Sequence, residues 1–529
     1  MCASCPWLGH YEAPAGQSPA PPANRREPRT LRVTVRLLLW NVADSKTSLE
    51  EVRAKLPDLP EGDVWISDPA SERFGLISSS GSTDGLDRIR DLIGKDPEVG
   101  EEFEVESSGV YPRHRLDLKP RHLAYAGAAC LWARNGPRRA DKIEKTAPDG
   151  ALVCFSVRSA FELLLDALEL PPRSDVLMSA ITHPHMARIV ERHGLVPVPV
   201  DIDLDTLQPR PDLLGRALTP QTRAFVVAHL FGARADLAPL AAFCRAHDLI
   251  LIEDCAQSLR GPDDAGDPAS DVALFSFGSI KTAPALGGAI AYVRDPLLLR
   301  RMHRAQRFWP AQGRAEYALR VLRFAGLLAL GQPYVYEVFV RAGRRAGLNV
   351  DGLVNRSVHA LKPPSSDEAV AFGTWLRRRP SAPLLALLSR RLATFDADRL
   401  SRRAERGEKA MRALPAGLIH PGRAARDRTH WVFPVATSSP GAVIESLRKA
   451  GFDATAATSS IAAIDAPGDR SHLRPEKSIR LMKQVVFVPV YPELSNRAFH
   501  RVLETLSQLE DQRLGELDIG FEPGQAVRS

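Results

Sequence analysis

Between residues 151 and about 310, short apolar runs alternate with amphipathic segments, and this alternation limits the possible folds more than any other feature of the chain. The apolar runs are DVLMSAI, LVPVPVDI, RAFVVAHLFG, LILIEDCAQ, DVALFSFG and GAIAYV. Repeated β-α-β alternation predicts a mostly parallel sheet with helices on both faces. In such sheets ligands bind beyond the carboxyl ends of the strands, so catalytic groups are expected there.

The rest of the chain differs in composition from this region. Residues 31–110 have the order β-α-β-β-α-β, which is typical of a ferredoxin-like unit, and no catalytic constellation is visible in it. We divide the chain as follows: 1–30, a disordered tail rich in Pro and Ala; 31–110, a possible ferredoxin-like accessory module; 111–150, a linker; 151–310, the large domain; 311–365, a helical insertion; 366–512, a smaller α+β domain; 513–529, a loose tail.

The charge pattern narrows the class of partner. The chain of 529 residues has a net charge of +7, which favours anionic partners, but no Lys/Arg block is interleaved with aromatic residues. We therefore expect no nucleic-acid binding. The arginine-rich helical stretch 311–350 has FAGLLALG as its longest apolar run, too short to span a bilayer. Packing or a dimer contact is favoured there, and contact with a membrane surface is the alternative.

Cysteine usage and the amino terminus bear on location. Six cysteines in so long a chain do not make a disulfide framework. Cys2 and Cys5 form a CxxC, but a zinc site would need a second pair or histidines at ligand spacing, and His10 alone is not enough. No apolar segment of signal-peptide type follows the first residues. We expect a cytoplasmic protein without a bound metal.

Polar residues stand where two successive apolar runs end. In LILIEDCAQ the apolar run ends at Glu253 and Asp254. In DVALFSFGSIK the apolar run is followed by Ser276 and Lys281. A carboxylate and an amine that face one crevice match pyridoxal 5′-phosphate, which needs a lysine for a Schiff base and an acid beside its ring nitrogen. Lys281 and Asp254 fit these two roles.

The segment FSVRSAFELLLDALEL predicts a helix that opens at Ser159 and whose amino terminus suits a phosphate group. Ser159 and Glu162 also have the S-x-x-E spacing of a capping box, which needs no ligand. Both interpretations stay open. His229, which follows another apolar run, is equally open between a substrate contact and a buried structural histidine.

These motifs carry a family resemblance. IEDCAQS, followed by FSFGSIK and ALGGAIA, resembles the signature of the DegT/StrS-type sugar aminotransferases, which are fold type I pyridoxal phosphate enzymes. DVLMSAITHPH, GLVPVPVDIDLDTL and TPQTRAFVVAHLFG support the resemblance. It covers residues 151–310 well and residues 366–510 loosely.

The resemblance implies catalytic and cofactor-binding roles. Lys281 would be the Schiff-base lysine and proton carrier, Asp254 would pair with the pyridine nitrogen, and Gln257 would contact the phenolic oxygen. Ser276 and Ser159 would contact the phosphate. His183 stands where the family has an aromatic residue stacked on the cofactor ring, and Gly287 and Gly288 match its glycine pair.

Two departures from the family pattern concern ligand binding. Arg158 stands where the family has a glycine before the phosphate-binding residue, and prolines stand in HALKPPSSDEAVAFG where the family has an Asn and Arg from the partner subunit. Arg158 therefore concerns the expected contact between the start of this helix and the cofactor's phosphate. The second prevents transfer of the substrate contacts.

Together these observations predict an aminotransferase that uses pyridoxal 5′-phosphate. The resemblance implies that it moves an amino group from an amino-acid donor, glutamate in most relatives, to a keto acceptor such as a nucleotide-linked keto sugar, and that it works as a homodimer. A lyase or dehydratase on the same cofactor is one alternative, against which Lys281 argues. A non-catalytic binding or scaffold protein is the other.

Overall fold

The structure is a computed structural model. It describes five strands within residues 31–107, then residues 109–346, Val350, residues 369–456 and residues 461–509. Among them, no helix combines the length and apolar character that a membrane span requires.

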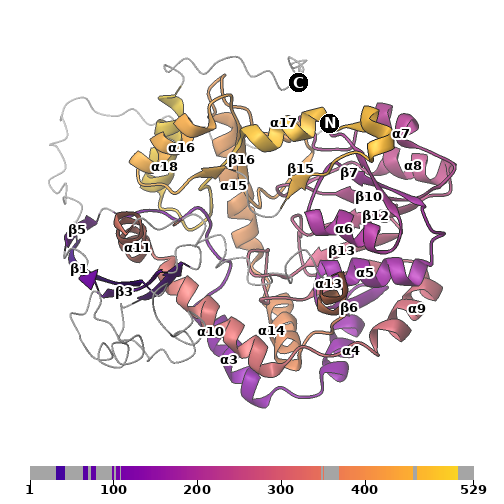
Figure 1. Cartoon of the computed structure of the whole chain (residues 1–529), viewed down its shortest axis with the longest axis horizontal. Helices are drawn as coiled ribbons and strands as arrows, with labels where there is room; N and C mark the ends of the chain where they lie inside the picture. The colour runs from indigo at the N-terminus through magenta and orange to yellow at the C-terminus, as the bar shows by residue number, and fades with distance from the viewer. Residues whose placement is uncertain are drawn as a thin grey trace, which may run out of the picture.

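The large domain is built on a seven-stranded sheet in the order β6-β14-β13-β12-β10-β7-β9 (Figure 1). All neighbouring strands are parallel except at β14, which is antiparallel to both β13 and β6. This is the mostly parallel sheet that the alternation predicted. The strands are β6 (Ala151–Cys154), β7 (Asp175–Ser179), β9 (Val196–Val200), β10 (Thr222–Ala228), β12 (Ile250–Asp254), β13 (Val272–Ser276) and β14 (Ala289–Val293).

Helices cover both faces of this sheet because successive strand residues point to opposite sides. On β12, Ile252 packs with residues of α5 (Val157–Leu168), α6 (Pro184–Arg192) and α9 (Pro296–Gln306). Leu251 packs on the other side with residues of α7 (Pro211–Ala217) and α8 (Ala238–Ala246). Because helices cover both faces of the sheet, polar side chains can gather at the two ends of the strands.

The small domain follows late in the chain and contains a three-stranded antiparallel sheet in the order β16-β19-β17. Its core lies between this sheet and the helices around it. The elements are α13 (Ala369–Leu376), α14 (Ala382–Ala393), α15 (Ala397–Arg412), β15 (Asp427–Arg428), β16 (Phe433–Ala436), α16 (Pro440–Lys449), β17 (Thr455–Ala456), β18 (Ala462–Ala463), η1 (Gly468–Leu473), α17 (Glu476–Gln484), β19 (Val485–Val488) and α18 (Asn496–Ser507).

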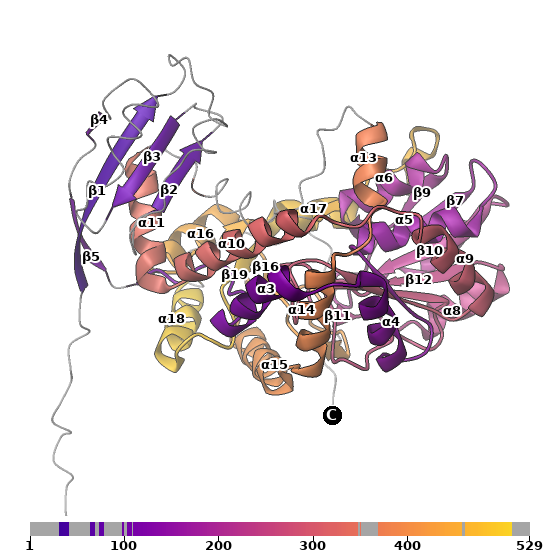
Figure 2. The ribbon, with the colours of Figure 1, turned by 90° about the horizontal axis from the view of Figure 1, so that it is seen from below.

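The amino-terminal strands form a separate antiparallel sheet (Figure 2). Its order is β2-β3-β1-β4, with β5 also paired to β1, so the predicted hairpin β2–β3 lies beside the first strand. The two helices predicted between these strands fall outside the described residues. The strands are β1 (Leu31–Asn41), β2 (Val64–Asp68), β3 (Arg73–Ser78), β4 (Glu98–Val99) and β5 (Phe103–Ser107).

The segments predicted as a linker and as an insertion form helices that connect these parts. Residues 111–150 contain α3 (Pro120–Trp132) and α4 (Gly136–Thr146), which contact α14, and α3 also contacts α10 (Arg314–Leu330). After α10, α11 (Pro333–Arg345) lies against β1 and β5 of the amino-terminal sheet (Figure 2). The Arg-rich stretch therefore packs between two sheets.

Candidate functional site

Asp254 is the last residue of β12 and points to the face of the sheet that carries Ile252. Its side chain is buried, with 9% of the residue exposed. Among the described residues it accepts one hydrogen bond, from the Ala256 amide to Oδ1 at 3.0 Å. Burial raises the pKa of this carboxyl, while the backbone hydrogen bond and the charge of Lys281 oppose the shift.

Lys281 follows the next strand, β13, and lies in a loop at the same end of the sheet. Its Nζ is 4.2 Å from the centre of the Trp431 ring, whose Nε1 donates to the Ile280 carbonyl at 3.0 Å. Burial lowers the pKa of Lys281 to about 8; the charge of Asp254 raises it and that of Arg158 lowers it further. The predicted amine and carboxylate thus come within electrostatic range of each other.

Gln257 and Ser276 lie at the ends of the same two strands. Gln257 Oε1 accepts a hydrogen bond from the Phe231 amide at 2.7 Å, which fixes the orientation of the side chain. Its amide nitrogen donates to none of the described residues. Ser276 is the final residue of β13 and its Oγ accepts from the Gly278 amide at 3.4 Å. Both side chains keep hydrogen-bonding capacity for a ligand.

The start of α5 differs from the prediction. The helix is capped by Ser156, whose Oγ accepts from the Ser159 amide at 3.1 Å, so Ser159 lies within the first turn and does not open the helix. The predicted capping box is wrong, because Glu162 is instead bound by His193 and Arg377. Ser156 is an unbranched polar residue with extended backbone, and such residues are the preferred N-caps.

Arg158, the second residue of α5, turns its guanidinium toward this site. Its Nη1 lies 3.1 Å from His185 Nδ1, and its Cζ lies 4.6 Å from the centre of the Trp375 ring. No carboxylate of the described residues lies within ion-pair distance of it. Burial lowers the pKa of Arg158 to about 10, and the charge of Arg320 acts in the same direction. A cation without a carboxylate partner therefore stands at the amino terminus of α5.

His183 lies at the start of α6, where its Nδ1 accepts a hydrogen bond from the His185 amide at 3.1 Å. The two imidazole rings are 4.6 Å apart. The ring of His183 therefore has a defined orientation as a helix cap. Its stacking on a cofactor ring stays a prediction.

The glycine pair after Lys281 is required by its surroundings. Gly287 and Gly288 have φ values of +149° and +89°, which residues other than glycine rarely adopt. A Cβ on Gly287 would lie 2.9 Å from Leu384 Cδ1, and one on Gly288 would lie 3.1 Å from Leu384 Cδ2. The pair allows α14 to pack closely against the loop that carries Lys281.

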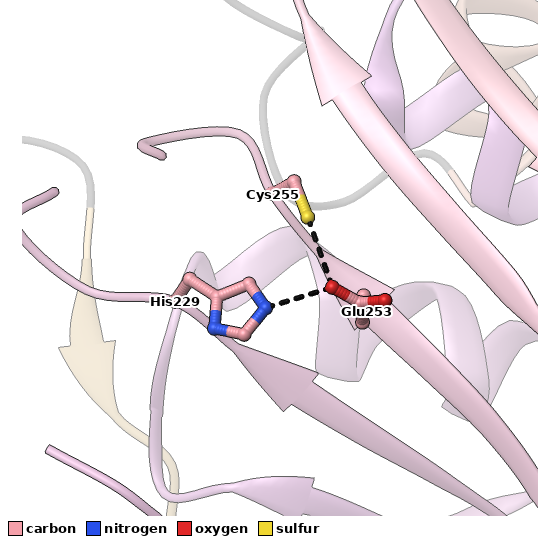
Figure 3. A group of neighbouring side chains, drawn as sticks. All are labelled: His229, Glu253 and Cys255. Atoms are coloured by element: carbon pink, nitrogen blue, oxygen red, sulfur yellow. Dashed lines mark hydrogen bonds and ion pairs between the residues drawn. The ribbon is translucent and has the colours of Figure 1, made fainter. Parts of the chain in front are cut away.

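The opposite face of β12 holds a second polar cluster, made of His229, Glu253 and Cys255 (Figure 3). His229 Nδ1 accepts from the Ala235 amide at 3.1 Å, so Nε2 carries the proton and donates to Glu253 Oε2 at 3.0 Å. Cys255 Sγ donates to the same oxygen at 3.4 Å. The structural interpretation of His229 is thus the correct one.

The three side chains of this cluster have the chemistry of metal ligands, and their ligand atoms lie within 4.8 Å of one another. A metal would have to displace the proton of His229 Nε2 and the hydrogen bond that it makes. The hydrogen bonds among His229, Glu253 and Cys255 are sufficient to explain why these side chains lie together. The predicted lack of a metal stays a prediction.

A second group of residues lies against Lys281, and the sequence analysis did not predict it. They come from residues 113–117, from α15 and from the loop before β16, and include His114, Arg403 and Trp431. No local pattern marks them, because segments separated by up to about 300 residues must fold together before these residues meet. Burial lowers the pKa of His114 to about 4, and the charges of Arg399 and Arg403 lower it further.

Comparisons with known proteins bear on the family resemblance and on the fold. Residues 144–329 match the model of the DegT/DnrJ/EryC1/StrS aminotransferase family. In structure, the chain is similar to the aminotransferase TlmJ from Streptoalloteichus hindustanus, with a TM-score of 0.53 and 21% identity over 76% of this chain and 99% of that one. The fold type I architecture predicted from the sequence is confirmed.

Two curated relatives match parts of the chain. The dTDP-4-dehydro-2,3,6-trideoxy-D-glucose 4-aminotransferase of Saccharopolyspora spinosa is 33% identical over 187 residues, which are 34% of this chain and 48% of the relative. The L-glutamine:2-deoxy-scyllo-inosose aminotransferase of Streptomyces kanamyceticus is 38% identical over 143 residues, 26% of this chain and 33% of the relative. The chain thus spans half or less of these relatives' length. Within residues 144–329, which include Asp254 and Lys281, the predicted resemblance to the DegT/DnrJ/EryC1/StrS aminotransferase family is confirmed.

Proposed function

We propose that the chain is an aminotransferase that uses pyridoxal 5′-phosphate and moves an amino group from an amino-acid donor to a keto acceptor. The observation that carries the proposal is the pair formed by Asp254 and Lys281. One is a buried carboxylate with an unused oxygen, and the other is a buried amine whose pKa is lowered to about 8. Perturbed groups of opposite type at the carboxyl ends of neighbouring strands are characteristic of active sites.

The described residues fit this cofactor at its ring end. When bound, the cofactor supplies an electron sink for the carbanion formed at the donor's α-carbon. Asp254 would hold a proton on the ring nitrogen through Oδ2, which no described residue binds, and the Gln257 amide nitrogen would donate to the phenolic oxygen. His183 would cover one face of the ring.

The residues also fit at the phosphate end. The backbone N–H groups at the amino terminus of α5 and the hydroxyls of Ser159 and Ser276 are donors for a phosphate. Arg158 adds a positive charge beside them, and none of the described carboxylates lies within ion-pair distance of it. The departure from the family's glycine therefore favours an anion at this place, and we assign the phosphate contact to the site with Arg158 included.

Lys281 acts as the proton carrier. With the cofactor bound, the free amine of Lys281 would take the proton from the donor's α-carbon and return it at a different carbon. An amine with a pKa near 8 exchanges a proton readily at neutral pH, whereas an ordinary lysine stays protonated.

The substrate class follows from the relatives. Both curated relatives are named for aminotransfer to a keto sugar or an inosose, and we propose a keto sugar, carried on a nucleotide, as the acceptor. The donor is glutamate or glutamine; the relative from Streptomyces kanamyceticus is named for glutamine. We further propose that the active protein is a homodimer.

An absorption spectrum tests the proposal. The purified protein is incubated with pyridoxal 5′-phosphate, and glutamate or glutamine is then added. We expect a visible band of the lysine-bound cofactor that one of the donors bleaches. The variant Lys281→Ala lacks the band, whereas Lys449→Ala, which removes an exposed lysine paired with Glu445, retains it.

Two results would contradict the proposal in different ways. A band that neither donor changes would keep the cofactor and remove the transamination. A wild-type protein with no band at all would favour the non-catalytic scaffold.

A further inference from the structure

Helix α13 lies beyond residues 144–329, the part of the chain that matches the family model, and packs against α5. Figure 1 shows it beside α5 and α6. Arg377, directly after α13, binds Glu162 of α5 at 2.8 Å. A Cβ on Gly373 of α13 would overlap the guanidinium of Arg192 at the end of α6. Close contacts with both helices thus hold α13 in place.

α13 brings two aromatic rings to these helices. Phe372 and Trp375 are stacked, with ring centres 6.0 Å apart and an angle of 18° between the rings. His185, in the first turn of α6, lies edge-on to both, at 5.3 Å from Phe372 and 6.1 Å from Trp375. Phe372 is buried, whereas Trp375 is half-buried. The three rings form an aromatic wall.

The guanidinium of Arg158, in the first turn of α5, lies against this wall. Its Cζ is 4.6 Å from the centre of the Trp375 ring. Its Nη1 donates to His185 Nδ1 at 3.1 Å, since a guanidinium has no acceptor. Burial, with the charge of Arg158, lowers the pKa of His185 to about 4, so the ring is neutral and can accept this hydrogen bond.

No other acceptor among the described residues binds this guanidinium. An arginine that stacks on a ring uses its flat face, and the N–H groups in its plane stay available for hydrogen bonds. The donors of Arg158 that His185 does not use can therefore reach an anion. The orientation of the guanidinium depends on Trp375 and His185.

We propose that Trp375 is a positioning residue, which holds Arg158 in the orientation that binds the cofactor's phosphate. The inference rests on the proposed function, which assigns the phosphate to the amino terminus of α5. A long arginine side chain loses rotamer freedom when it binds an anion. Stacking on Trp375 restricts Arg158 beforehand, so phosphate binding has less side-chain motion to remove.

Pyridoxal 5′-phosphate and pyridoxal differ only in the phosphate, and their affinities for the cofactor-free protein test the proposal by calorimetry. Trp375→Leu is expected to weaken pyridoxal 5′-phosphate binding about 5- to 30-fold, because the cation–π contact is lost. The affinity for pyridoxal should not change. The matched control is Trp132→Leu: Trp132 also carries a stacked arginine, Arg139 at 4.8 Å, but lies on α3. It should leave both affinities unchanged.

A double-mutant cycle shows whether Trp375 acts through Arg158. Arg158→Met should itself weaken pyridoxal 5′-phosphate binding and leave pyridoxal binding unchanged. In that background Trp375→Leu should have no further effect, because the ring has no cation to hold. Trp375→Phe keeps an aromatic face and should recover most of the wild-type affinity.

A folded Trp375→Leu protein with the wild-type ratio of the two affinities would overturn the proposal. Equal losses for both compounds, or additive losses in the double variant, would also overturn it, since they indicate a merely structural role. Trp375→Phe with the affinity of Trp375→Leu would contradict the assignment to the ring face. Should Trp375→Leu fail to fold, Trp375→Met fills the volume with a flexible chain, and the same results decide.

Failure of this inference can be told apart from failure of the proposed function, because the titrations contain no amino donor. A cofactor band that glutamate or glutamine bleaches, together with the wild-type affinity ratio in Trp375→Leu, would reject the inference alone. A band that neither donor changes, together with a reduced ratio in Trp375→Leu and a wild-type ratio in Trp132→Leu, would reject the aminotransferase and retain the role of Trp375.

Discussion

Glu253 and Asp254 are adjacent on β12 and point to opposite faces of the sheet, yet their environments differ in kind. Glu253 is fully buried and accepts hydrogen bonds from His229, from Cys255 and from the Asp267 amide. Burial alone would raise its pKa, but hydrogen bonds, above all the one from His229, lower it to about 2. Asp254 accepts one hydrogen bond and has a raised pKa.

The difference separates a carboxylate whose oxygens are used within the fold from one that keeps an oxygen for a ligand. The oxygens of Glu253 are used by residues of the fold, so this side chain stabilises the loops after β10 and β12. Asp254 is held at a strand end with an oxygen unused, which costs stability and leaves a charge for a ligand. Both are buried carboxylates, and their hydrogen-bond partners distinguish them.

The largest effect expected from this comparison is on activity. Asp254→Asn keeps the size of the side chain and removes its charge, so the ring nitrogen of the cofactor loses its partner. We expect kcat/KM to fall at least ~100-fold, with a change in the free energy of unfolding within ~1 kcal/mol. Steady-state kinetics and urea unfolding of the same preparation measure both. An activity within tenfold of wild type would remove the functional role of Asp254.

At Glu253 we expect an effect on stability and none on cofactor binding. Glu253→Gln removes a charged acceptor from three donors, and the free energy of unfolding is expected to fall by about 2 kcal/mol. Cofactor binding by the folded fraction should not change, because this face of β12 does not meet Lys281. If Glu253→Gln lost the cofactor band but kept the wild-type free energy of unfolding, Glu253 would have the role assigned to Asp254.

The same contribution of Glu253 has a defined pH dependence. Its pKa is lowered on folding from 4.5 to about 2, so the stabilisation is complete above pH 4.5 and is lost as the pH falls toward 2. The difference in unfolding midpoint between wild type and Glu253→Gln should therefore shrink across this interval. A difference that stays constant down to pH 2 would contradict the assigned shift.

Local patterns in the sequence were sufficient for the fold and for most of the candidate site. Strand and helix periods predicted the sheet, and the strand ends predicted Asp254, Ser276 and Lys281, because a residue at the end of a parallel strand has little freedom in where it lies. The cap of α5 was misplaced because Ser156 and Ser159 both have the side chain of an N-cap residue. Only the backbone conformation of Ser156 decides between them.

The second group of residues beside Lys281 could not be predicted in this way. His114, Arg403 and Trp431 are far apart in the sequence, and each looks ordinary within its own segment. Arg403 stands in an arginine-rich helix next to Arg402, and which of the two is buried depends on how α15 packs against the loop with Thr282. Tertiary packing thus created a distinction that neither composition nor spacing contains.

The smallest effect expected from the comparison is a shift in a pH profile. Capture of pyridoxal 5′-phosphate needs the neutral amine of Lys281, so the rate should rise with pH around a midpoint near 8, below the usual 10.5. Asp254 raises the pKa of Lys281, while burial and Arg158 lower it. Asp254→Asn should therefore move the midpoint to lower pH.

Glu253→Gln is the matched control for this shift, since it removes a carboxylate from the neighbouring residue on the other face of the sheet. Its midpoint should stay at the wild-type value, because Glu253 does not act on the pKa of Lys281. Stopped-flow absorbance between pH 6 and 10 measures the midpoint in all three proteins, over about the range where Lys281 titrates. Equal shifts in the two variants would mean that the sheet does not separate the two carboxylates electrostatically. The distinction between them would then rest on hydrogen bonding alone.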